Sequence, residues 1–215
     1  MTPPLDARER VQLCARLEEV GPDAPTLCEG WTTFDLAAHL DVRERNPVAA
    51  PGILLGERIP PLGRITGQAM ARTKERGYAA LLDRIRTGPP FGPFRIPALR
   101  EQLNLNEYAV HHEDVRRANG MGPRDDLDDL QEALWKLLRR SARLLFRAVP
   151  KPYGLALARP GGDTAEARAS RPTVTVTGEP LELVLFGFGR KGAAQVQFDG
   201  DPAAVAAVRD AALGI

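Results

Sequence analysis

The hydrophobic periodicity of this chain changes near Pro150, and that change constrains the fold more than any other feature. Before Pro150, apolar side chains recur every three or four positions over long stretches, the spacing of amphipathic helices. After it the segments are short, and TVTVT at 173–177 alternates as a half-buried strand does. We therefore predict an α+β fold, with an antiparallel helical bundle over residues 1–150 and a small α/β module over residues 151–215.

Boundary residues define the individual elements. The predicted helices of the first part are 6–20, 32–46, 64–86, 98–119 and 126–149. Thr32 and Asp35 have the spacing of a capping box, and Gly120 fits the position just after a helix end. In the second part we predict strands at YGLALA, TVTVT and AQVQFDG and helices at EPLELVLFGFGR and DPAAVAAVRDAAL. Asp201 is the predicted N-cap of the last helix, and Gly161–Gly162 a hairpin or loop.

Composition excludes several classes of protein. With 43% hydrophobic and 27% charged residues, the chain is typical of a globular protein. A net charge of +1 argues against a nucleic-acid-binding surface. Two cysteines are too few for a disulfide framework. The start of the sequence lacks the apolar segment of a signal peptide. No apolar stretch approaches the roughly 18 residues of a membrane span. We therefore expect a cytoplasmic protein with no nucleic acid or membrane as its partner.

The histidines carry the clearest chemical signal. Glu107 and His111 are four residues apart and share one face of a predicted helix, in a stripe that begins with apolar residues such as Leu103. A carboxylate buried on such a face is costly unless a cation or metal compensates it. His39 lies in the apolar segment FDLAAHL of another helix. If the two helices are neighbours, His39, Glu107 and His111 form a two-histidine, one-carboxylate set, the layout of a catalytic zinc site. The set also suits iron or nickel.

Alternatives remain for each of these residues. The alternative for the histidines is that they are hydrogen-bonded core residues in a site without metal. His112 points roughly 100° away from His111 and is interpreted as a surface residue or as a group that supports a metal ligand. Asp114, one turn beyond His111, is a candidate for the supporting role. Cys28 is either a reactive thiol or a buried structural cysteine.

Three segments carry a family resemblance: APTLCEGWTTFDLAAHLDVRER, NEYAVHHEDVRRA and TGEPLELVLFGFGRKGAAQVQFDGDPAAV. They resemble the mycothiol-dependent maleylpyruvate isomerase family, which is part of the DinB-like bundle superfamily. The resemblance implies a four-helix bundle that binds a divalent metal through His39, Glu107 and His111, the set that spacing also favours. It further implies that Arg190 faces the metal cleft and clamps a substrate carboxylate. The alternative is that Arg190 caps a helix C-terminus.

The function that the resemblance implies is that of a metal-dependent isomerase or thiol-S-transferase. Zinc is the expected metal, mycothiol the expected cosubstrate, and a small-molecule thiol and an electrophile are the expected partners. Metal coordination deprotonates a thiol, and the thiolate is the nucleophilic form. The alternative is a non-catalytic protein that binds a small molecule, with a metal that is structural or absent. A third hypothesis is a DNA-associated stress protein, but the near-neutral net charge argues against it. The sequence makes no prediction of oligomeric state.

Overall fold

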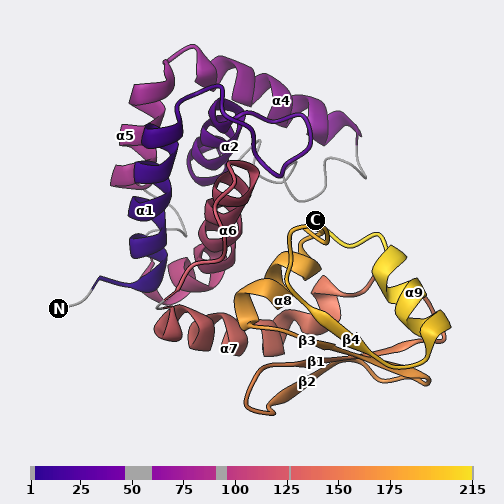
Figure 1. Cartoon of the computed structure of the whole chain (residues 1–215). Helices are drawn as coiled ribbons and strands as arrows, with labels where there is room; N and C mark the ends of the chain where they lie inside the picture. Colours follow the sequence, from indigo (N-terminus) through magenta and orange to yellow (C-terminus); the bar gives the residue numbers. More distant parts are fainter. Residues whose placement is uncertain (1–2, 47–59, 91–95, 126, 215) are drawn as a thin grey trace. The chain divides into compact units, whose positions relative to one another are not determined.

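The structure is a computed structural model that describes residues 3–46, 60–90, 96–125 and 127–214. Its contacts divide the chain into two compact units, Met1–Pro123 and Arg124–Ile215 (Figure 1). The described part of the first unit is helical, and the second unit combines helices with a four-stranded sheet. The prediction of a mixed α+β fold is therefore confirmed. Most of the predicted connection at 47–63 lies outside the described residues.

The first unit is built from five described helices. They are α1 (Leu5–Val20), α2 (Thr33–Arg45), α4 (Pro60–Lys74), α5 (Tyr78–Thr87) and α6 (Pro97–Ala118). Helix α1 packs along α6 and α5, and α2 packs along α4 and α5. The predicted capping box is present, because the Thr32 hydroxyl accepts from the Asp35 N–H while the Asp35 carboxylate accepts from the Thr32 N–H. Fully buried Leu13, Leu36 and Leu81 bring α1, α2 and α5 into one apolar core.

One predicted helix is two helices. The stretch 64–86 divides at Gly77, whose φ of 84° interrupts the helix between α4 and α5. Glycine adopts this left-handed conformation without the steric cost that a Cβ would add. The prediction of one continuous helix was wrong because helix-forming residues flank Gly77 on both sides, so spacing alone shows no break.

The second unit packs helices on a mixed sheet. Its elements are α7 (Asp128–Leu145), β1 (Gly154–Ala158), β2 (Thr164–Arg168), β3 (Thr173–Thr177), α8 (Pro180–Gly187), β4 (Gln197–Asp199) and α9 (Pro202–Asp210). The strand order is β2-β1-β3-β4; β1 runs antiparallel to β2 and parallel to β3, and β3 runs antiparallel to β4. Asp201 caps α9 as predicted, accepting from the N–H groups of Ala203 and Ala204.

Two features of the second unit differ from the sequence-based expectation. Strand β2 was not predicted, because its buried positions are Ala165 and Ala167, which give only a weak apolar alternation. Helix α7 packs against α8 and β2 and groups by contacts with the second unit, although the sequence placed the boundary at residue 150. The division of the chain into folding units at residues 1–150 and 151–215 remains a prediction.

Among the described residues, no helix has both the length and the apolar character needed to cross a bilayer.

Gly187 allows α8 to pack closely on α7. A Cβ at this position would lie 2.5 Å from Leu145 Cδ2 and 2.9 Å from Phe146 Cζ, both on buried side chains. We expect Gly187→Ala to lower the free energy of unfolding by about 1–3 kcal/mol, because overpacking forces neighbouring side chains away from their preferred rotamers. Urea unfolding measures the effect. The matched control is Gly192→Ala, whose Cβ would meet nothing within 4 Å; equal stability of the two variants would contradict the packing argument.

Candidate metal centre

Side chains from α2 and α6 converge on one carboxylate oxygen, Oε1 of Glu107. His39 Nε2, on α2, lies 3.0 Å from this oxygen, and His111 Nε2, on α6, lies 3.3 Å from it. Arg43 Nε, also on α2, lies 3.3 Å from the same oxygen. Both histidines are buried, with 7% of each exposed. The structure thus brings together the three residues that the sequence analysis selected and adds a guanidinium.

Helical spacing explains how the two helices present these groups. His39 and Arg43 are four residues apart on α2, as Glu107 and His111 are on α6, so each helix contributes two side chains from successive turns. The Arg43 guanidinium is held in place by donating to Asn104 Oδ1 at 2.7 Å and to the Leu103 carbonyl at 2.5 Å. Leu103 itself is 42% exposed. Contrary to the expectation for a bundle helix, the stripe on α6 is therefore not buried along its whole length.

Burial and neighbouring charges set the protonation of the ligands. Burial by itself would raise the pKa of Glu107, but the charge of Arg43 and the hydrogen bonds with the two histidines hold that pKa well below its usual range. Burial lowers the pKa of His39, despite the opposing effect of Glu107. The carboxylate is therefore ionised and the His39 imidazole is neutral, which are the forms that coordinate a metal.

The other nitrogen of His111 faces a different set of groups. Asp114 Oδ2 lies 2.8 Å from His111 Nδ1, and the Cys28 thiol donates to the same Asp114 oxygen at 3.3 Å. Burial lowers the pKa of His111, but the hydrogen bonds with Asp114, Cys28 and Glu107 outweigh it and raise that pKa well above its usual value. Asp114 is fully buried and lies where the sequence analysis expected a supporting group. A carboxylate on one ring nitrogen orients the other nitrogen toward a metal.

Two residues of the neighbourhood differ from expectation. His112 is 4% exposed, and its Nδ1 lies 3.4 Å from Glu9 Oε2 on α1, so its interpretation as a surface residue was wrong. The helix face that it occupies is covered by α1. Arg43 was missed because arginines near the end of a helix are common; its only sequence signal is the four-residue spacing from His39, which matches that of Glu107 and His111.

The donor set fits a divalent metal ion. The candidate ligand atoms of His39, Glu107 and His111 all lie within 4.8 Å of one another. Metal bonds to nitrogen and oxygen are about 2.0–2.2 Å, so two ligands of one ion lie at most about 4.4 Å apart. The separations of 3.0 and 3.3 Å between Glu107 and the histidines are within this limit. The spacing therefore allows one ion to bind Glu107 together with either histidine.

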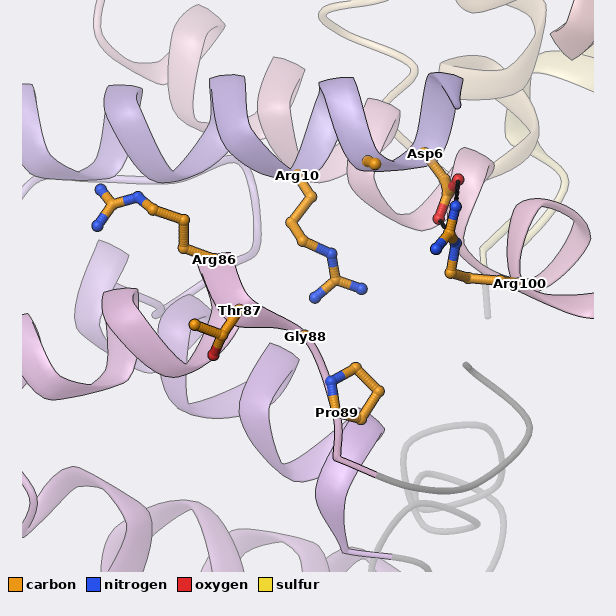
Figure 2. Close-up of a pocket in the computed structure, with 8 residues that line it drawn as sticks. Asp6, Arg10, Arg86, Thr87, Gly88, Pro89 and Arg100 are labelled. Carbon is orange, nitrogen blue, oxygen red and sulfur yellow. Dashed lines mark hydrogen bonds and ion pairs between the residues drawn. The ribbon is translucent and has the colours of Figure 1, made fainter. Parts of the chain in front are cut away.

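A separate cavity of about 280 Å³ lies beside α1 in the first unit (Figure 2). Its lining consists of Asp6, Ala7, Arg10, Arg86, Thr87, Gly88, Pro89 and Arg100. Each arginine pairs with a carboxylate; the pairs are Arg10–Glu44, Arg86–Glu18 and Arg100–Asp6. Figure 2 shows the Arg100 side chain turned toward Asp6. Because the arginine charges are compensated, this cavity is a weaker candidate for ligand chemistry than the histidine cluster.

Arg190 belongs to the second unit and follows the end of α8. Its Nη1 donates to the Phe188 carbonyl at 2.7 Å, at the C-terminus of that helix. This is the contact expected of the capping alternative. The role of Arg190 as a clamp for a substrate carboxylate stays a prediction.

Comparison with known proteins adds one finding. No protein-family model matches the chain, and no curated protein matches its sequence. A crystal structure of a mutant of the mycothiol-dependent maleylpyruvate isomerase matches with a TM-score of 0.53, covering 93% of this chain and 96% of that chain. The likeness is one of fold. At 18% sequence identity it shows a shared fold alone, and the function must be argued from the site.

Proposed function

We propose that this protein is a divalent-metal enzyme that activates a small-molecule thiol, as an isomerase or thiol-S-transferase of the mycothiol-dependent type. The observation that carries the proposal is the convergence of His39 and His111 on the ionised carboxylate of Glu107. The fold likeness to a mycothiol-dependent isomerase supports this class of function. In this proposal the first unit is a DinB-like four-helix bundle, zinc is the metal, and mycothiol is the thiol of a cytoplasmic reaction.

Each side chain of the cluster has a distinct task in the proposal. His39, Glu107 and His111 would hold the ion, and three protein ligands leave a coordination position for an outside molecule. Arg43 keeps Glu107 ionised and holds its Oε1 toward the two histidines. Asp114 orients the His111 ring so that Nε2 faces Glu107.

The chemistry follows from the state of the thiol. A bound divalent ion supplies a positive charge that stabilises a thiol as its thiolate. A thiolate held beside an electrophile either adds to an activated double bond or displaces a leaving group. Reversible addition to a double bond permits rotation about it and so cis–trans isomerisation, whereas displacement gives thiol transfer. The same cluster therefore serves either reaction, and the electrophile decides which one occurs.

Cobalt-substituted protein tests the thiol-activating role. Titration with mycothiol is expected to produce a saturable thiolate-to-cobalt charge-transfer band, because the thiol takes the position that the protein leaves open. The titration is done in Cys28→Ser protein, so that the nearby Cys28 thiol does not contribute to the band. Glu107→Ala in the same background is the control and should give no band.

Two other results would decide against the proposal. Cobalt that binds tightly without any response to thiol would indicate a closed, structural metal. Failure to bind cobalt at all would remove the enzyme mechanism, and a non-catalytic small-molecule-binding protein would then account better for the fold.

A further inference from the structure

A second group of metal-ligating side chains lies on the far side of the His111 ring. Cys28 Sγ is 3.3 Å from Asp114 Oδ2 and 4.0 Å from His111 Nδ1, and the last two atoms are 2.8 Å apart. Asp114 and His111 are buried, and Cys28 is half-buried. We propose that Cys28, His111 and Asp114 form a second metal site, selective for a thiophilic cation such as Cd²⁺.

The backbone holds Cys28 in this place. The loop between α1 and α2 is tied to α6 at the site itself, since the Leu27 N–H donates to the Asp114 carbonyl at 3.2 Å. Within the loop, the Cys28 N–H donates to Thr26 Oγ1 at 3.2 Å, and the Trp31 N–H donates to the Cys28 carbonyl at 3.0 Å. The thiol is thus one member of a fixed three-residue group, presented from two different elements.

The spacing of the donor atoms suits one ion. Metal bonds to sulfur are about 2.3 Å and bonds to nitrogen or oxygen about 2.0–2.2 Å, so sulfur can lie up to roughly 4.5 Å from another ligand of the same ion. The three separations in the Cys28 group are all shorter than the corresponding limits. An ion can therefore contact all three side chains after small rotations, with the thiol proton and any proton on Nδ1 released to solvent.

The two ligand sets favour different cations. The set of His39, Glu107 and His111 offers only nitrogen and oxygen, whereas the Cys28 set includes a thiolate. Thiolate ligands select soft ions, and carboxylate-rich sets select harder ones. We expect Cd²⁺ to prefer the Cys28 set for this reason.

His111 cannot serve both sets at once. A neutral imidazole has one nitrogen with a free lone pair and one that carries a proton. When Nδ1 binds an ion, the proton stays on Nε2, which then donates to Glu107 Oε1 at the observed 3.3 Å. An ion at the Cys28 set therefore removes a ligand from the first set. This exclusion rests on the proposed function, whereas the Cys28 site does not.

Titration of the full chain with Cd²⁺, followed by the ultraviolet charge-transfer absorbance of a cadmium thiolate, tests the second site. We expect a saturable band at about one equivalent in the wild type, because His111 serves one ion at a time. The band should persist in His39→Ala, disappear in Cys28→Ser, and require at least about ten-fold more Cd²⁺ in Asp114→Asn. Cys14→Ala is the matched control and should keep the band, since burial raises the pKa of the Cys14 thiol to about 11.

The outcomes separate this site from the proposed function. Absence of the band in the wild type would overturn the second site. So would a band whose midpoint is unchanged in both Asp114→Asn and His111→Gln, because Cys28 would then bind Cd²⁺ alone. Zinc content measured in the Cys28→Ser background reports on the first set alone. Loss of zinc when His39→Ala is added to Cys28→Ser, with retention of the cadmium band in His39→Ala alone, would support both sites. Retention of zinc in protein that carries both Cys28→Ser and His39→Ala would count against the proposed function alone.

Discussion

In the Cys28→Ser background, which removes the second ligand set, Glu107→Ala is expected to lower the metal content from about one equivalent per chain to none, with the helical circular dichroism unchanged. The substitution removes the carboxylate on which His39 Nε2 and His111 Nε2 converge. Arg43 Nε lies 3.3 Å from Glu107 Oε1, so the substitution also removes the counter-charge of this guanidinium. The uncompensated positive charge then repels a cation. Elemental analysis of protein purified without chelator or a nickel column makes the measurement.

A second histidine on the same helix provides the control. His112 is as buried as His111 but faces Glu9 on α1, so His112→Gln should keep the metal that Glu107→Ala loses. His39→Ala should behave as Glu107→Ala does, because it removes the ligand that α2 supplies. Retention of a full equivalent of metal in the Cys28→Ser background, in both His39→Ala and Glu107→Ala, would rule out the assignment of these ligands.

Glu44→Ala is expected to destabilise the first unit by about 3–5 kcal/mol, because it leaves a buried guanidinium without its carboxylate. Glu44 accepts from Arg10 at 2.7 Å, from Asn104 at 3.0 Å and from Tyr108 at 2.9 Å. Arg10 is 5% exposed and Tyr108 is fully buried, so water cannot easily replace the lost acceptor. Urea unfolding followed by circular dichroism gives the change in the free energy of unfolding.

An exposed ion pair is the comparison for this effect. Glu18 contacts Arg86 at 3.0 Å, but its side chain is 68% exposed. Glu18→Ala should therefore change the free energy of unfolding by no more than about 1 kcal/mol. If Glu44→Ala were as mild as Glu18→Ala, the buried network around Arg10 would contribute little to the stability of this unit.

The sequence by itself determined the features that depend on neighbouring residues. The capping box of Thr32 and Asp35, the N-cap Asp201 and the alternation of β3 were all predicted, because each follows from spacing within one element. The shared face of Glu107 and His111 was predicted for the same reason. Local spacing also has limits: it did not show the break at Gly77, where the chain takes a conformation that its neighbours do not signal.

Only the tertiary structure decided which elements meet. It places α2 beside α6, so that His39 and Arg43 reach Glu107, and it ties the loop of Cys28 to Asp114. It also groups α7 with α8 and the sheet. These contacts join residues far apart in the chain, and they depend on how whole apolar faces pack together. The periodicity of a single segment shows that a face is apolar, and the packed structure alone shows which partner covers it.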